Sequence, residues 1–175
     1  MEHWNQDQQT VSGFGAQWSR FDQSELTEPE KLKLFQEYFS LIELPANARV
    51  LDMGCGSGRW AAFVSPKCKE LVAADASEEA LHVARQNLAH CGNVRFVNAS
   101  PETLPETLGN FDLIYSLGVL HHIPDTEKAI HDLADRLSPN GQLLLYLYYA
   151  FDNRPVWYRA LWRKDMSGES RRTLV

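Results

Sequence analysis

The sequence predicts a doubly wound α/β fold, in which helices cover both faces of a parallel β-sheet. Apolar, strand-like runs alternate along the chain with segments of helical periodicity, which favours parallel strands joined by right-handed crossovers. The apolar runs are continuous, as expected for strands buried on both faces. Three glycines within five residues follow the first such run. A chain of 175 residues suits a single domain of this kind.

The first predicted elements are a helix over residues 28–43 and a strand over residues 49–53. Pro29 suits the first turn of the helix, and Pro45 ends it. The apolar positions on one face of this helix are Leu32, Phe35, Phe39 and Ile42. The strand stops at the glycines, and residues 59–64 have the pattern of a second helix start. The chain thus opens its repeating pattern with a strand, a glycine turn and a helix.

The same alternation continues to residue 149. Further strands are expected over residues 70–75, 94–99, 111–117 and 142–149. Ser77 is a natural N-cap for a helix that runs to about residue 90. The core-facing residues of this helix would be Leu81, Ala84 and Leu88. Asp125 can cap another helix, and residues 139–141 (Pro-Asn-Gly) form the stop before the last strand.

Composition and charge exclude several classes of protein. The net charge is −6, and residues 151–175 carry six basic and three acidic side chains, so the first 150 residues hold −9. Such an acidic body argues against nucleic acid as a partner.

The longest apolar run spans nine residues, 143–151, whereas a membrane helix needs about 20. The N-terminus lacks the pattern of a secretory signal, so the expected location is the cytoplasm. The three cysteines contain no CxxC pair, so neither a disulfide framework nor a metal site is expected.

Two features at the ends of adjacent strands indicate a ligand site. Gly54, Gly56 and Gly58 lack the Cβ atoms that would block a ligand, and they permit the positive φ of a tight turn. Asp75 closes the second strand, 21 residues after Gly54, where a carboxylate can accept both hydroxyls of a ribose. Together they indicate an adenosine-containing ligand. The alternatives are an ordinary βα turn for the glycines and a helix-entry residue for Asp75.

The spacing of the glycines separates the classes of adenosine ligand. A dinucleotide fingerprint GxGxxG would place its third glycine at residue 59, which is Arg. A phosphate-binding GxxxxGK[ST] loop is absent, because Gly58 is followed by Arg59 and Trp60. Asp52 stands two residues before the first glycine. A carboxylate in that place suits a ligand that brings an ammonium group rather than a pyrophosphate.

Three stretches of sequence carry a family resemblance. VLDMGCGSG at residues 50–58 resembles the first motif of class I S-adenosylmethionine-dependent methyltransferases. FDLIYSLGVLHHIPD at 111–125 and LSPNGQLLL at 137–145 resemble the later motifs of their small-molecule branch. The resemblance implies a Rossmann-like sheet of strand order 3-2-1-4-5, with S-adenosyl-L-methionine as cofactor. It also implies methyl transfer to a small or medium-sized acceptor by in-line displacement.

The resemblance assigns a role to each matching residue. The methionine part of the cofactor would lie against Asp52, the backbone of Gly54, Cys55 and Gly56, and the backbone of Leu117. Asp75 would bind the ribose hydroxyls, and Ala76 would lie against adenine. Ser100 stands where the family has an Asp that reads adenine, and Pro101 after it has no N–H to offer the ring. His121, beside His122, could deprotonate a hydroxyl acceptor, or it could cap the loop or pack on the cofactor.

The two ends of the chain carry separate expectations. Residues 1–27 would form a lid or arm in which Arg20 meets the methionine carboxylate, or they would pack on the surface. Residues 28–150 would form the cofactor-binding domain. Residues 151–175 form a basic, aromatic tail that suits packing against protein or contact with a membrane surface.

The length is short for the family. Its members usually end in an antiparallel hairpin beside strand five, and nothing after Tyr149 resembles one. Strand five would then be an exposed sheet edge. The expectation is that the chain is part of a longer protein or that a partner or second copy pairs there. A catalytically silent binding or scaffolding subunit is the alternative to an enzyme, and a nicotinamide oxidoreductase is disfavoured by Arg59.

Overall fold

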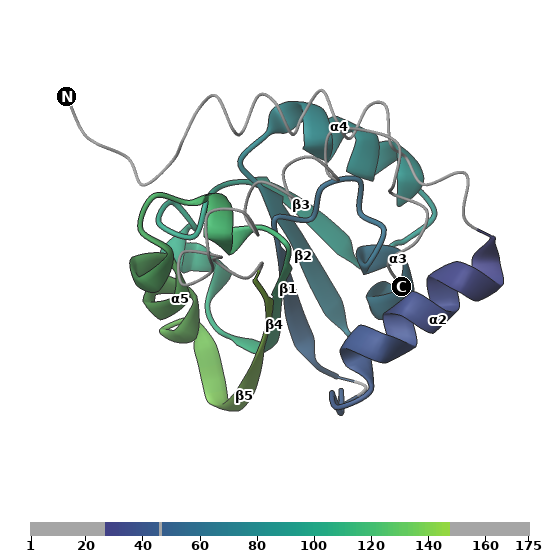
Figure 1. The fold of residues 1–175 in the computed structure, drawn as a ribbon, viewed down its shortest axis with the longest axis horizontal. Coiled ribbons are helices and arrows are strands. Elements are labelled where there is room, and N and C mark those ends of the chain that lie inside the picture. Colours follow the sequence, from purple (N-terminus) through teal and green to yellow (C-terminus); the bar gives the residue numbers. More distant parts are fainter. Residues whose placement is uncertain (1–26, 46, 148–175) are drawn as a thin grey trace, which may run out of the picture.

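The computed structural model describes residues 27–45 and 47–147, and it contains one five-stranded sheet (Figure 1). The strands are β1 (Arg49–Met53), β2 (Glu70–Asp75), β3 (Val94–Asn98), β4 (Phe111–Leu117) and β5 (Leu137–Tyr146). Their order is β3-β2-β1-β4-β5, and every neighbouring pair is parallel. The predicted doubly wound fold and its strand order are confirmed.

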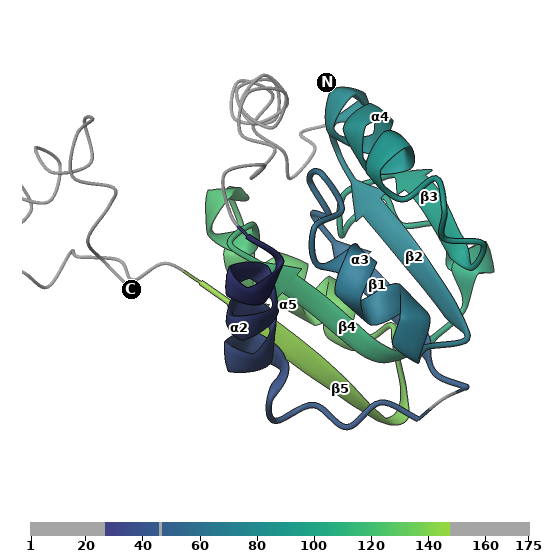
Figure 2. The same ribbon diagram turned by 90° about the vertical axis from the view of Figure 1, so that its right-hand side faces the viewer.

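Helices pack on both faces of this sheet. They are α2 (Glu28–Phe39), α3 (Ala61–Val64), α4 (Glu78–Asn87) and α5 (Thr126–Ala134), with 3₁₀ turns η1 (Ser65–Lys67), η2 (Glu106–Leu108) and η3 (Leu120–His122). Residues of α2, α3 and α4 share one buried cluster, and residues of α5 belong to a second cluster on the opposite face. Figure 2 shows α2 and α3 in front of the sheet. The sheet is therefore covered on both sides, as its apolar strands require.

Both predicted helix caps are present. The Ser77 hydroxyl accepts a hydrogen bond from the Ala80 backbone N–H at the start of α4. Asp125 Oδ1 accepts one from the Lys128 N–H, 2.9 Å away, at the start of α5. The predicted core-facing residues of α4 are all buried: Leu81, Ala84 and Leu88. Local sequence signals thus specify where α4 and α5 begin.

Several boundaries differ from the prediction. α2 ends at Phe39 rather than at residue 43, and α4 ends at Asn87 rather than near residue 90. The expected stop at residues 139–141 is wrong, because these residues lie within β5, which begins at Leu137. β4 pairs Phe111 with Leu137 and then Leu113 with Gln142, so residues 138–141 bulge opposite a single residue. An edge strand tolerates such a bulge and the proline in it.

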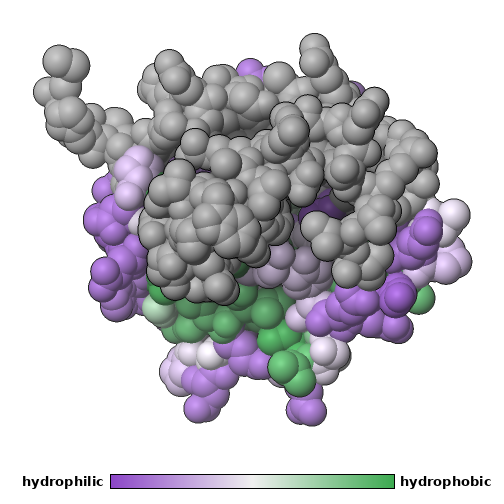
Figure 3. Space-filling model, viewed as in Figure 1, coloured by the Kyte–Doolittle hydropathy of each residue, from purple (hydrophilic) through white to green (hydrophobic). Residues whose placement is uncertain are grey.

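β5 forms one edge of the sheet in the described part of the chain. None of its residues is fully buried, and Tyr146 and the following Leu147 are 40% and 38% exposed. Figure 3 shows hydrophobic surface in the region where Figure 1 draws β4 and β5. The predicted lid with Arg20, the basic tail and the question of a final hairpin fall on residues 1–26 and 148–175, outside the described residues. No helix among the described residues is long and apolar enough to cross a membrane.

Candidate functional site

The glycine turn after β1 is built on left-handed backbone. Gly54, Gly56 and Gly58 have φ values of 79°, 53° and 79°. A Cβ at Gly54 would lie 2.5 Å from Val119 Cγ2, and a Cβ at Gly58 would lie 2.6 Å from Leu88 Cδ1. Two of the three glycines are therefore required by packing as well as by backbone conformation. The contact with Val119 also brings the loop after β4 against the turn after β1.

Asp75 joins the glycine turn to helix α4. Its Oδ2 accepts the Gly56 backbone N–H at 2.9 Å, and its Oδ1 accepts the Ser77 N–H at 2.9 Å. Burial raises the pKa of the Asp75 carboxyl above its usual range, and backbone hydrogen bonds from Ser77, Gly56 and Ala76 oppose this rise. A carboxylate has about four lone-pair sites on its two oxygens, so it can still accept further donors. Asp75 thus holds the turn together and keeps the capacity to bind two hydroxyl groups.

Asn98 supports this segment from the neighbouring strand, and it was not predicted from the sequence. Asp75 and Asn98 are register partners at the carboxyl ends of β2 and β3. The Asn98 side-chain amide donates to the backbone oxygens of Asp75 and Ala76, at 3.0 and 3.1 Å. The only available signal was a polar residue closing an apolar strand.

A buried pair lies beneath the glycine turn. The Tyr115 hydroxyl donates to Asp52 Oδ2 across 2.9 Å, and both side chains are buried. Burial is the main cause that raises the pKa of Asp52 to about 8. The hydrogen bond from Tyr115 and the charge of Arg59 oppose this pKa shift, and the charge of Asp75 adds to it. Sequence reasoning found Asp52 and missed Tyr115, a polar-tipped residue in an otherwise apolar strand.

Cys55 lies within the turn as a buried thiol. Burial raises its pKa well above the usual range, and the nearby carboxyls of Asp52 and Asp75 raise the pKa further. A thiol that keeps its proton at neutral pH is neither a nucleophile nor a metal ligand. Cys55 therefore contributes backbone and packing to the turn. Among residues 27–45 and 47–147, no three His, Cys, Asp or Glu side chains are grouped so that they could hold a metal ion.

Ser100 follows β3 at the same edge of the sheet as Asp75. Its side chain is buried, and its hydroxyl lies 3.1 Å from Thr103 Oγ1. The Ser100 backbone N–H also donates to Thr103 Oγ1 at 2.8 Å. Leu117 ends β4, where the N–H of the following Gly118 donates to the Tyr146 carbonyl at 2.9 Å. The predicted adenine and methionine positions therefore share one edge with Asp75, and the Ser100 hydroxyl already has a local partner.

His121 and His122 lie in η3, two residues beyond the Val119 contact with Gly54. Their ring centroids are 3.9 Å apart. Burial, with a smaller effect of His122, lowers the pKa of His121 to about 4, and burial also lowers the pKa of His122. Both rings are thus neutral at physiological pH. The structure brings the predicted histidine pair to the carboxyl edge, next to the glycine turn.

Comparisons with known proteins agree with this geometry. A family model described as a methyltransferase domain matches residues 50–141. An uncharacterized methyltransferase of Bacillus subtilis, YcgJ, is 35% identical over 131 residues, which are 74% of this chain and 51% of that protein. The YcgJ crystal structure gives a TM-score of 0.60 at 32% identity, and the match covers 69% of this chain and 50% of the other. A ubiquinone biosynthesis O-methyltransferase of Xanthomonas axonopodis pv. citri is 36% identical over 111 residues, 62% of this chain and 46% of that protein.

The N-methyltransferase NodS from Bradyrhizobium japonicum, in complex with S-adenosyl-L-homocysteine, gives a TM-score of 0.65 at 22% identity. That match covers 78% of this chain and 71% of NodS. Because the sequence identity is low, the match shows that the two proteins share a fold and nothing about a shared acceptor. The chain spans about half the length of the curated relatives it matches. The family model alone covers more than half of the 175 residues, so the chain belongs to the class I S-adenosylmethionine-dependent methyltransferase family.

Proposed function

We propose that this chain binds S-adenosyl-L-methionine and transfers its methyl group to a small or medium-sized acceptor by in-line displacement. The observation that carries the proposal is the Asp75 carboxylate, held between the glycine turn and α4 by two backbone N–H groups. Its remaining lone pairs fit the two hydroxyls of a ribose. The names of the relatives, which include an enzyme of ubiquinone biosynthesis, support a small-molecule acceptor.

The neighbouring residues fit the rest of the cofactor. Ala76 follows Asp75 and is fixed by the Asn98 amide, so it can offer an apolar surface to adenine. Ser100 lies beyond it, with its hydroxyl directed to Thr103. The methionine part would lie at the turn from Gly54 to Gly56, above the buried carboxyl of Asp52, with the backbone of Leu117 on the β4 side.

Bound S-adenosyl-L-methionine supplies an electrophilic methyl group on a sulfonium sulfur. The residues of this chain mainly hold that methyl group and the acceptor about 3 Å apart in a site that excludes water. His121 can accept a proton from a hydroxyl acceptor because its ring is neutral. A base with a pKa of about 4 is weak, so its contribution is limited to acceptors that ionise readily. We therefore assign most of the catalysis to positioning.

Calorimetry with S-adenosyl-L-homocysteine tests the binding part of this proposal. Asp75→Ala removes the acceptor of two charge-assisted hydrogen bonds, each worth about 1.5–3 kcal/mol, so affinity is expected to fall by about 100-fold or more. Asp135→Ala is the matched control, because Asp135 is an exposed carboxylate at the far end of α5. Absence of binding by the unaltered protein, or equal affinity in the Asp75 variant, would refute the assigned site.

Transfer of a labelled methyl group to a panel of phenol, amine and carboxylate acceptors tests the catalytic part. An enzyme transfers label to at least one acceptor class, and Asp75→Ala abolishes the transfer. Binding of S-adenosyl-L-homocysteine without transfer to any acceptor would instead favour the silent binding or scaffolding subunit.

A further inference from the structure

We propose that Tyr115 is a positioning residue for the cofactor: its hydroxyl fixes the Asp52 carboxyl so that the pair recognises the ammonium group of the ligand's amino-acid part. The inference rests on the proposed function. Tyr115 lies outside the glycine turn and has no role in the proposed function as stated above. With this role, recognition of the ligand's amino-acid part can be measured separately from recognition of its adenosine part.

Sheet register places the two side chains together. Asp52 of β1 and Tyr115 of β4 are direct register partners in adjacent parallel strands, so their side chains project from the same face. The hydroxyl donates to Asp52 Oδ2 at 2.9 Å. This contact links residues 63 positions apart in the sequence. The carboxyl is therefore oriented by the sheet itself rather than by the loop that follows it.

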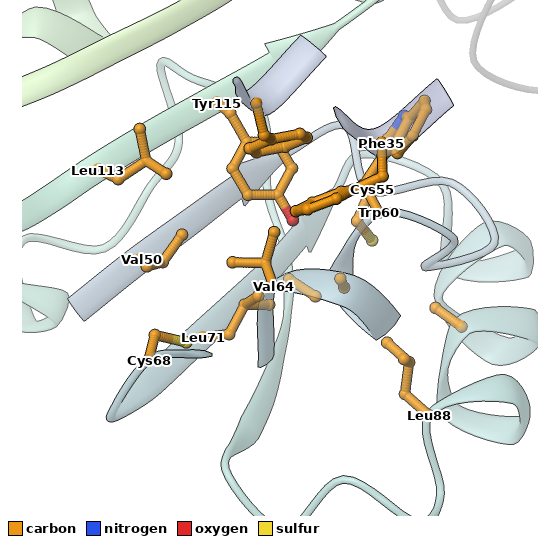
Figure 4. Close-up of a cluster of buried hydrophobic side chains, with 14 of the residues drawn as sticks. Phe35, Val50, Cys55, Trp60, Val64, Cys68, Leu71, Leu88, Leu113 and Tyr115 are labelled. Carbon is orange, nitrogen blue, oxygen red and sulfur yellow. The ribbon is translucent and has the colours of Figure 1, made fainter. Parts of the chain in front are cut away.

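The Tyr115 ring cannot easily leave this position. Phe39 of α2 packs edge-on against it with ring centroids 5.2 Å apart. Figure 4 shows the Tyr115 side chain pointing into the cluster that also contains Phe35, Trp60 and Val64. Burial raises the pKa of the Tyr115 hydroxyl well above its usual range, and the Asp52 carboxyl raises the pKa further. The hydroxyl thus stays protonated and keeps donating.

The electrostatics of the pair favour a cationic ligand. A buried carboxylate is costly unless it has hydrogen-bond donors and an opposite charge. Tyr115 supplies one donor to Oδ2. Among the charged groups that act on Asp52, Asp75 disfavours its ionised form and Arg59 favours it. An ammonium group placed at the glycine turn would add the missing positive charge, whereas an uncharged ligand at the same place would not.

The experiment compares two ligands that share adenosine and differ in the amino-acid part. S-adenosyl-L-homocysteine carries the ammonium group, and 5′-methylthioadenosine lacks the whole amino-acid portion. Tyr115→Phe keeps the ring and removes the hydroxyl. By calorimetry it is expected to weaken binding of S-adenosyl-L-homocysteine about tenfold or more, and binding of 5′-methylthioadenosine less than about twofold.

Ser116→Ala is the matched control. It also removes one buried hydroxyl from β4, one that has no hydrogen-bond partner within the described residues, and its side chain projects from the opposite face of the strand. Affinity for both ligands should be unchanged in this variant. Thermal unfolding of each variant shows whether it is folded before it is titrated.

A second variant keeps the test decisive if Tyr115→Phe does not fold. Asp52→Asn retains an oxygen that accepts from the Tyr115 hydroxyl and removes the negative charge, so it should show the same ligand-selective loss. Equal weakening of both ligands, or of neither, in the folded variants would overturn the inference and leave the proposed function intact. If the unaltered protein binds neither ligand, the proposed function fails, and the inference fails with it.

Discussion

Asp52 makes folding stability depend on pH in a way that one substitution should reveal. Its pKa in the folded protein is about 8, whereas an unfolded aspartate has a pKa of about 3.9. Between these two values the folded state binds the proton more tightly than the unfolded state. The free energy of unfolding therefore falls as pH rises through this range, and the loss is complete above about pH 8.

The magnitude follows from the same two pKa values. Well inside the window, the loss approaches about 1.4 kcal/mol per pH unit, so it amounts to about 2–3 kcal/mol between pH 5 and pH 7. Asp52→Asn removes the titrating group and leaves an oxygen for the Tyr115 hydroxyl. Any constant effect of the substitution cancels when two pH values are compared. The variant should thus gain about 2–3 kcal/mol relative to the unaltered protein from pH 5 to pH 7.

Urea unfolding at pH 5, 6, 7 and 8, followed by tryptophan fluorescence without ligand, measures this difference. Asp135→Asn serves as the control, because its carboxylate is exposed and its profile should run parallel to that of the unaltered protein. A difference between Asp52→Asn and the unaltered protein that stays constant within about 0.5 kcal/mol from pH 5 to pH 7 would refute the reasoning. Asp52 would then be ionised in the folded protein throughout that range.

Three further outcomes are expected. Binding of S-adenosyl-L-homocysteine at pH 7 should release close to one proton, because the ammonium group of the ligand favours the ionised form of Asp52. Calorimetry in buffers of different ionisation enthalpy measures the number of protons released. The Asp52→Asn variant should release none. Gly58→Ala should lower stability in urea by about 1–3 kcal/mol, because φ is +79° and the new Cβ would lie 2.6 Å from Leu88 Cδ1. Ser77→Ala should lower stability in urea by about 1 kcal/mol through loss of the α4 cap.

The sequence predicts the bounds of a strand closely where a glycine or a polar residue ends its apolar run. The bounds of β1, β2 and β4 agree with the predictions residue for residue, because each apolar run ends at a glycine or at a polar residue. The end of α2 and the start of β5 were not predicted. Ile42 continues the apolar stripe of α2 beyond the actual end of the helix. The bulge of residues 138–141 depends on how β5 pairs with β4, which no local pattern reports.

The candidate site divides in the same way. Gly54, Gly56 and Asp75 could be predicted because their spacing lies within one strand-turn-helix-strand unit. Tyr115 and Asn98 could not, because their roles arise from register with Asp52 and Asp75 on neighbouring strands, 63 and 23 residues away in the sequence. Periodicity assigns a residue to a face of a strand, but it does not say which residue lies beside it on the next strand.

Side-chain hydrogen bonds connect four of the five strands at the carboxyl edge of the sheet. Asn98 ties β3 to β2, Asp75 ties β2 to the turn after β1, and the Asp52–Tyr115 pair ties β1 to β4. β5 takes no part in these side-chain hydrogen bonds. Near the site it accepts a backbone hydrogen bond, from the Gly118 N–H to the Tyr146 carbonyl. The proposed cofactor site is therefore held by β1, β2 and β4, which each have a neighbour on both sides, and by β3, which forms the edge opposite β5. A strand or partner added at the β5 edge should therefore leave the hydrogen bonds of Asp75 and Asp52 as they are.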